Sequence, residues 1–263
     1  MKIGILREGK NPPDKRVPFT PKQCAILLQE YSHVQWVVQK SSIRCFADEE
    51  YAQMGMRLVE DVSDCDILFG VKEVPKSNLI AYKTYFYFSP TIKQQLYNRD
   101  LLKKMIELNI SMVDYEALKQ PNGKRLIGFG RYAGVVGCYN GFLAYGKRTK
   151  RYELKAAHNC FDRKELEIEL SKIDLPNVKI IITGNGRVGR GALEIIHFLG
   201  LKEVSKEEFI NKSFSEPVFV HLDFLDYNAR VDSLPSSESD FFTNPKMYKS
   251  IFMQYAKHAD IFI

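Results

Sequence analysis

Three glycines between an apolar run and a helical pattern have the spacing that points most directly to chemistry. Gly184, Gly186 and Gly189 follow Lys179-Ile-Ile-Ile-Thr183, whose β-branched residues are typical of a strand buried on both faces. Beyond them, apolar residues recur at helical spacing as far as Gly200. Such a turn lets the backbone approach a pyrophosphate, which the first N–H groups of the helix bind. The pattern predicts a dinucleotide site, and the simpler alternative is a glycine-rich turn that binds nothing.

The strand after this helix would decide which dinucleotide binds. We expect the second strand of the nucleotide fold at Lys202-Glu-Val204, followed by Ser205 at the position where an acid would bind the ribose 2′-OH. Glu203 and Glu207 lie alongside, but neither clearly ends the strand. The sequence therefore leaves the choice between NAD and NADP open.

Two cations are expected at the carboxyl ends of strands in the first half of the chain. Arg16 lies in a loop between a short strand, Lys2-Ile-Gly-Ile-Leu6, and a helix that Thr20-Pro21-Lys22-Gln23 opens with a capping box. Lys72 directly follows the apolar run Asp66-Ile-Leu-Phe-Gly-Val71. Because open α/β sheets bind ligands at the carboxyl ends of their strands, both side chains are candidate ligand contacts.

The strand and helix patterns alternate, which predicts an α/β fold with two Rossmann-like, doubly wound domains and mainly parallel sheets. A glycine-dotted helix from Gly130 to about Tyr145 is expected to connect them, so we place a substrate domain at 1–146 and a dinucleotide-binding domain at 147–263. The chain stops within the apolar run Ile261-Phe-Ile263, so we expect the second domain to be incomplete at its C-terminus. The expected strands are Lys2–Leu6, Val34–Val38, Arg57–Val59, Asp66–Val71, Tyr85–Phe88, Ile110–Val113, Lys179–Thr183, Lys202–Val204 and Pro217–Leu222, with a polar loop at Pro235–Asp240 and a helix at Tyr248–Tyr255.

The composition limits the classes of partner. Of the 263 residues, 45% are hydrophobic and 27% charged, and no apolar run approaches the roughly 18 residues that span a bilayer. The N-terminus lacks the apolar core of a signal peptide, so we expect a cytoplasmic protein without a membrane partner. A net charge of +6 is spread over the chain, and its basic cluster, Lys147–Arg151, accompanies no nucleic-acid motif, so no nucleic-acid partner is expected. Five widely spaced cysteines without a C-x-x-C pair argue against disulfides and against a metal site.

Four stretches, taken in order, resemble the alanine dehydrogenase and transhydrogenase superfamily and, within it, the lysine-forming saccharopine dehydrogenases. The forms Gly-x-Lys-Glu-x-Pro and Phe-Gly-x-Tyr-Ala-Gly are more similar to saccharopine dehydrogenase than to alanine dehydrogenase. The four stretches are Arg16-Val-Pro-Phe-Thr-Pro21, Gly70-Val-Lys-Glu-Val-Pro75, Phe129-Gly-Arg-Tyr-Ala-Gly134 and the glycine turn.

The resemblance implies two α/β domains with the active site in the cleft between them. It implies that NAD takes a hydride from the carbon beside the secondary amine of saccharopine, after which water splits the imine into lysine and 2-oxoglutarate. By the same match Lys72 is a catalytic proton-transfer group. The implied substrate contacts are Arg16, Gln95 and Arg125, and the implied cofactor contacts are Lys124, Phe129, Arg187 and Val188 together with the three glycines.

One position departs from the family pattern. The catalytic histidine would fall in Phe88-Ser-Pro-Thr-Ile-Lys93, at Pro90, and proline has no titratable group. Two alternatives therefore stay open beside a saccharopine dehydrogenase-like enzyme. One is an alanine dehydrogenase-like enzyme for a small amino acid, and the other is a truncated, non-catalytic relative that only binds ligand. The sequence does not indicate the oligomeric state.

Overall fold

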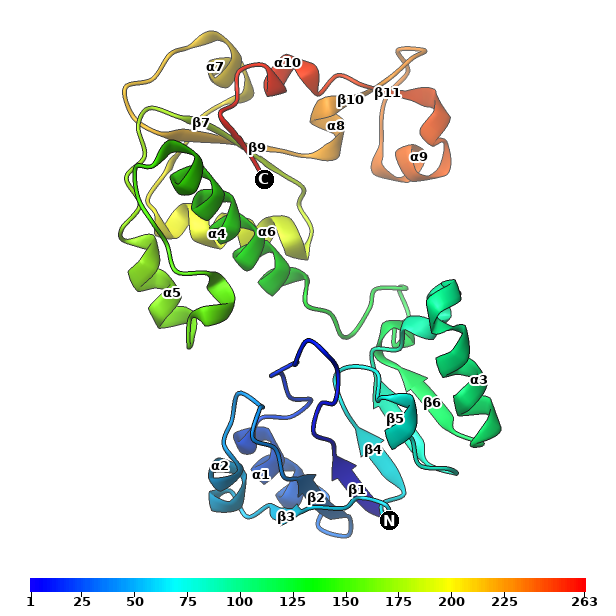
Figure 1. Cartoon of the computed structure of the whole chain (residues 1–263). Coiled ribbons are helices and arrows are strands. Elements are labelled where there is room, and N and C mark those ends of the chain that lie inside the picture. Colours follow the sequence, from blue (N-terminus) through cyan, green and yellow to red (C-terminus); the bar gives the residue numbers. More distant parts are fainter. The chain divides into compact units, whose positions relative to one another are not determined.

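The computed structural model describes all residues from 1 to 263, in two compact units, Met1–Gly128 and Phe129–Ile263 (Figure 1). The division falls before the boundary expected at residue 146. The reason is helix α4 (Gly130–Thr149), which packs along helix α6 (Arg187–Phe198) of the second unit. The glycine-dotted helix is therefore part of the second unit and does not lie between the two.

The first unit contains an entirely parallel six-stranded sheet in the order β3-β2-β1-β4-β5-β6. The chain moves outward from β1 to β3 and then returns to place β4 beside β1. The sheet thus changes direction between β1 and β4, the position at which open α/β sheets form ligand crevices. The strands are β1 (Lys2–Ile5), β2 (Gln35–Gln39), β3 (Arg57–Val59), β4 (Ile67–Phe69), β5 (Thr84–Tyr87) and β6 (Ser111–Asp114).

Helices cover both faces of this sheet, and each face has its own apolar core. One core includes Ile5, Trp36 and Tyr51, and the other includes Leu68 and Tyr85. The first helix begins as predicted, because the Thr20 hydroxyl accepts the Gln23 N–H at 3.3 Å and the Gln23 side chain accepts the Thr20 N–H at 2.8 Å. The helical elements are α1 (Pro21–Glu30), α2 (Asp48–Gln53), η1 (Lys76–Asn78), η2 (Pro90–Lys93), η3 (Leu96–Asn98), α3 (Arg99–Glu107) and η4 (Tyr115–Ala117).

The second unit contains a four-stranded parallel sheet in the order β12-β7-β9-β8, which confirms the predicted α/β class with parallel sheets. The predicted second strand is reduced to the two residues of β8 and pairs with β9. The strand next to β7 is therefore β9, and the predicted second strand lies beyond it at the edge of the sheet. The elements are β7 (Lys179–Thr183), β8 (Lys202–Glu203), β9 (Val218–Leu222) and β12 (Ile261–Phe262), with η5 (Ala157–Asn159), α5 (Arg163–Leu170) and α7 (Lys206–Asn211).

A small lobe, residues 224–250, follows β9. Two local predictions are wrong in this lobe. A helix, α9, begins inside the polar loop expected at Pro235–Asp240, and a strand, β11, occupies the start of the helix expected at Tyr248–Tyr255. The pieces are α8 (Phe224–Tyr227), β10 (Asn228–Arg230), α9 (Glu238–Thr243), η6 (Pro245–Met247) and β11 (Tyr248–Ser250), and α10 (Met253–Ala256) then leads to β12.

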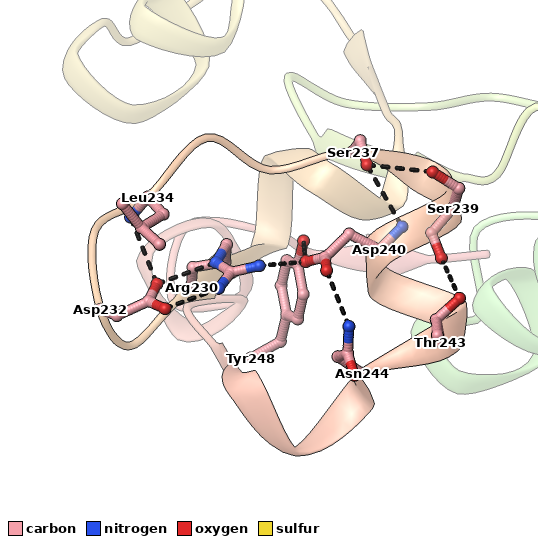
Figure 2. A network of polar contacts seen from close by, with 9 residues as sticks. All are labelled: Arg230, Asp232, Leu234, Ser237, Ser239, Asp240, Thr243, Asn244 and Tyr248. Carbon is pink, nitrogen blue, oxygen red and sulfur yellow. Dashed lines mark hydrogen bonds and ion pairs between the residues drawn. The ribbon is translucent and has the colours of Figure 1, made fainter.

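Charged contacts hold the lobe together (Figure 2). The Arg230 guanidinium donates to both oxygens of Asp232, at 2.8 and 2.6 Å, and also to Asp240. The Tyr248 hydroxyl donates to the same Asp240 oxygen at 2.8 Å, and the Asn244 amide donates to the other oxygen at 2.9 Å. One arginine therefore ties the strand β10 to helix α9 and to the strand β11.

Nowhere in the chain is a helix long and apolar enough to cross a membrane.

Glycines set the distance between α4 and α6. A Cβ added at Gly134 would lie 1.9 Å from the carbonyl oxygen of Val188, and one added at Gly191 would lie 2.0 Å from the carbonyl oxygen of Arg131. Backbone therefore rests directly on backbone at both points, where no side chain fits. Across the same contact, Arg131 Nε donates to the Glu194 carboxylate at 2.6 Å.

We expect Gly191→Ala to lower the free energy of unfolding by about 2 kcal/mol or more, since its methyl group would overlap the Arg131 carbonyl and push the helices apart. The matched control is Gly137→Ala in α4, where an added Cβ meets no atom within 4 Å. That change should be neutral or stabilise by up to about 1 kcal/mol through helix propensity. Urea unfolding measures both, and equal effects of the two substitutions would contradict the close contact.

Candidate functional site

A buried carboxylate joins the loop after β1 to the end of β4. Glu8 is only 9% exposed, and its two oxygens accept the backbone N–H groups of Val71 at 2.7 Å and Lys72 at 3.0 Å. Burial raises the pKa of Glu8 above 4.5, and the two backbone hydrogen bonds oppose that rise. A Cβ at Gly70 would lie 3.3 Å from Glu8 Oε1, so the glycine leaves room for the carboxylate. The backbone that carries Lys72 is thereby fixed to the first loop.

Further charges gather at the same sheet edge. Lys10 pairs with Glu73 at 2.7 Å, which is a second tie between the two loops. Arg16 Nε donates to Asp14 at 2.9 Å, and hydrogen bonding from Arg16 is the main cause that lowers the pKa of Asp14. Lys72 also lowers the pKa of Asp14, and both Asp14 and Arg16 act on the pKa of Glu8.

The structure thus brings together two of the predicted residues, Arg16 and Lys72, at the carboxyl ends of β1 and β4. Lys72 is half-buried, and its side chain takes part in none of the ion pairs of the chain. Two cations beside two carboxylates can bind a carboxylate ligand and can move a proton to or from it. Glu8 and Asp14 were missed by the sequence reasoning, although each lies in the polar loop that was singled out for Arg16.

The other predicted residues of the first unit have local partners. Gln95 Oε1 accepts the Tyr97 hydroxyl at 2.6 Å, and Gln95 lines a cavity of about 170 Å³ at the start of α3. Arg125 pairs with Glu116 at 3.6 Å, and Glu116 also pairs with Lys93 at 3.4 Å. Lys124 lies in an exposed turn, where its N–H donates to the Asn122 side chain at 3.0 Å. No hydrogen bond or ion pair joins Gln95 or Lys124 to the charges around Lys72.

Pro90 occupies the first position of η2, directly after β5. The Ser89 side chain caps this short helix by accepting the Thr91 N–H, and the Ser89 N–H donates to Asp114 at 3.1 Å. The Pro90 carbonyl accepts a hydrogen bond from the Asn98 amide at 3.3 Å. No histidine lies in this loop, so it supplies no imidazole for proton transfer.

In the second unit the glycine turn has the expected strand–turn–helix geometry. Gly184 has φ +88°, which glycine adopts readily. A Cβ at Gly189 would lie 1.8 Å from the Gly184 carbonyl oxygen, so the helix packs directly on the turn. A Cβ at Gly186, the N-cap of α6, meets no atom within 4 Å. Open space before unpaired N–H groups at a helix N-terminus suits a pyrophosphate.

Three more of the predicted cofactor residues meet beside this turn. Phe129 precedes α4, and a Cβ at the following Gly130 would lie 2.8 Å from the Cβ of Arg187 and 3.6 Å from the Cγ2 of Val188. Phe129 is 38% and Val188 54% exposed. The starts of α4 and α6 therefore lie side by side, and each helix N-terminus carries a partial positive charge. Binding by these residues stays a prediction.

The sequence reasoning missed Asp223, the acid at the end of the strand beside β7. The Gly184 N–H donates to the Leu222 carbonyl at 2.9 Å, so the next residue, Asp223, lies next to the glycine turn. One oxygen of Asp223 accepts the Phe224 N–H at 2.7 Å and caps α8. An acid at this place is what the dinucleotide fingerprint requires for the ribose 2′-OH. The sequence signal is the predicted strand Pro217–Leu222, which Asp223 follows directly.

We expect Glu8→Gln to lower the free energy of unfolding by about 1 to 3 kcal/mol, because the amide leaves one of the two backbone N–H groups without an acceptor. Since the folded pKa of Glu8 is raised above 4.5, its contribution to stability is largest below that pH and falls as the pH rises through the folded value. The deficit of the variant should therefore widen as the pH is lowered from neutral. Urea unfolding at several pH values measures it, with the more exposed Glu73→Gln as control. A constant deficit at every pH would refute this assignment.

Curated relatives cover most of the chain. Alpha-aminoadipic semialdehyde synthase, mitochondrial, of Rattus norvegicus is 30% identical over 245 residues, which are 83% of this chain and 26% of the relative. Saccharopine dehydrogenase [NAD(+), L-lysine-forming] of Yarrowia lipolytica is 27% identical over 215 residues, which are 75% of this chain and 58% of the relative. The chain thus spans about a quarter of the first relative and somewhat more than half of the second.

Solved structures share the fold at low sequence identity. An L-alanine dehydrogenase matches with a TM-score of 0.56 and 17% identity, over 84% of this chain and 61% of that one. A transhydrogenase from Sinorhizobium meliloti matches with a TM-score of 0.54 and 14% identity, over 98% of this chain and 66% of that one. Residues 4–136, half of the chain, match the family described as alanine dehydrogenase/PNT, N-terminal domain. The chain belongs to that family, as the order of its four motifs predicted.

Proposed function

We propose that the protein is an NAD-dependent oxidoreductase that acts on the CH–NH group of an amino acid. The substrate proposed is saccharopine, which would yield lysine and 2-oxoglutarate. The observation that carries the proposal is the glycine turn with open space at Gly186 and the acid Asp223 on the adjacent strand. The saccharopine dehydrogenase relative bears NAD(+) in its name, in agreement with this pair.

Asp223 supports NAD over NADP as the cofactor. A carboxylate accepts hydrogen bonds from a ribose 2′-OH and repels a 2′-phosphate. Phe129, Arg187 and Val188 would flank the dinucleotide at the start of α6. Bound there, NAD would accept the hydride from the substrate carbon beside the amine.

The charges around Lys72 supply the substrate side of the proposal. Saccharopine carries several carboxylates, and Arg16 with Lys72 offers two cations at one sheet edge. Lys72 would also exchange a proton with the substrate nitrogen, since its backbone is fixed by Glu8 and its ammonium forms no internal ion pair. Gln95 and Arg125 are proposed as further substrate contacts, and Lys124 as a cofactor contact.

A second candidate is a relative that binds both ligands without turnover. Pro90 favours it, because the loop after β5 has no second proton-transfer group. Loss of such a group typically costs about 10² to 10⁴ in rate. Binding and turnover therefore need separate tests.

We expect Gly186→Val to weaken NAD binding by well over tenfold while the fold is retained. The valine side chain would fill the space where the pyrophosphate must lie, and that space contains no protein atom for it to displace. Calorimetric titration with NAD measures the affinity, and thermal unfolding checks the fold. An unchanged affinity in the valine variant would remove the glycine turn from the cofactor site.

We expect Pro90→His to raise the rate of NADH formation from saccharopine by at least roughly tenfold, the low end of what a positioned acid–base group supplies. The control is Pro90→Ala, which frees the backbone in the same way but adds no titratable group. Absorbance of NADH measures both variants and the unaltered protein. If Pro90→His binds NAD but gives no turnover of saccharopine, alanine or other amino acids, the binding-only candidate stands.

A further inference from the structure

A histidine on β9 contacts the backbone of the glycine turn. His221 Nε2 lies 3.0 Å from the carbonyl oxygen of Gly184. A carbonyl oxygen only accepts hydrogen bonds, so the imidazole must carry its proton on Nε2. His221 stands opposite Ile182 in the β7–β9 register, so the contact reaches from the sheet to the first residue of the turn.

Gly184 is thus bonded to β9 through both of its backbone groups. Its N–H donates to the Leu222 carbonyl at 2.9 Å, and its carbonyl accepts from His221. The same carbonyl faces α6, where a Cβ at Gly189 would lie 1.8 Å from the oxygen. Rotation of this peptide group would move Asn185 and Gly186, which lead directly into the helix N-terminus.

We infer that His221 is a positioning residue for the dinucleotide turn. By donating to the Gly184 carbonyl, it holds the turn in the conformation that presents the N–H groups of α6 to a pyrophosphate. The inference rests on the proposed nucleotide site, and it adds a residue that lies outside the glycine motif. A site that is held ready before binding loses less conformational freedom when the ligand arrives, so this hydrogen bond contributes to affinity without touching the ligand.

Two substitutions separate the hydrogen bond from the volume of the ring. His221→Phe keeps a ring of similar size but cannot donate, whereas the His221→Gln side chain can reach the carbonyl with an N–H. Calorimetric titration with NAD should show at least about fivefold weaker binding for His221→Phe and less than about twofold weaker binding for His221→Gln. Hydrogen exchange of the Gly184 amide should be faster in the phenylalanine protein and close to normal in the glutamine protein. Equal affinity of His221→Phe and the unaltered protein would overturn the inference, and so would equal losses in both variants.

A measurement on the unaltered protein tests the inference without any variant, so it stands even if His221→Phe does not fold. With ¹⁵N-labelled histidine, nuclear magnetic resonance should show the His221 proton on Nε2. A neutral ring protonated on Nδ1 would overturn the assignment. If the unaltered protein binds no NAD, the proposed function fails, whereas the tautomer and the hydrogen exchange still decide the role of His221 in the turn.

Discussion

The second unit depends on backbone groups that approach one another more closely than any side chain would allow. Gly134 meets the Val188 carbonyl, Gly191 meets the Arg131 carbonyl, and Gly189 meets the Gly184 carbonyl. The first two contacts join α4 to α6, and the third joins α6 to the turn that follows β7. Because the backbones already touch at these points, the distance between α4 and α6 and the distance between α6 and the turn are both fixed. The glycines therefore have different tasks: Gly134, Gly189 and Gly191 allow close backbone contacts, whereas Gly186 faces open space at the start of α6.

The first unit is organised by a buried charge. Glu8 uses its carboxylate to bind two backbone N–H groups, so it holds the end of β4 without neutralising Lys72. Asp14 is the partner of Arg16, and Lys10 is the partner of Glu73. Separate partners keep the loop and the strand end together while the Lys72 ammonium stays unpaired within the chain. This sheet edge combines a fixed backbone at Lys72 with an ammonium that has no ion-pair partner in the chain.

Much of the element content could be predicted from the sequence, because it follows from local patterns. The Thr20 capping box, the strands around Ile5 and Ile181, and the glycine turn each depend on neighbours within a few residues. The order of strands in the sheet, in contrast, depends on contacts between residues far apart in the chain. Lys202–Glu203 is the next strand along the chain after β7, but both of its residues are exposed. The apolar strand that ends at Leu222 pairs with β7 instead.

The placement of α4 also depends on contacts between distant parts of the chain. Nothing within α4 states which unit it packs against, since the decisive contacts come from Gly191 and Val188 far along the chain. For the candidate site, the motif residues Arg16, Lys72 and the glycines could be predicted, whereas Glu8, Asp223 and His221 could not. Their roles depend on which strand ends lie next to each other. That is a property of the assembled sheet and not of any short stretch.

The sheet order of the second unit also has a consequence for how the protein is made. The strand β7 leaves the ribosome with neither of its neighbours, because β9 and β12 lie much later in the chain and the whole lobe tied by Arg230 is synthesised between them. Contacts between distant segments form slowly, since the intervening chain must be ordered first. In the first unit, β1 already finds its partner β2 after a single helix. The sheet around the glycine turn is therefore completed only after β9 and β12 have been synthesised, and until then the apolar strand β7 needs protection from other chains.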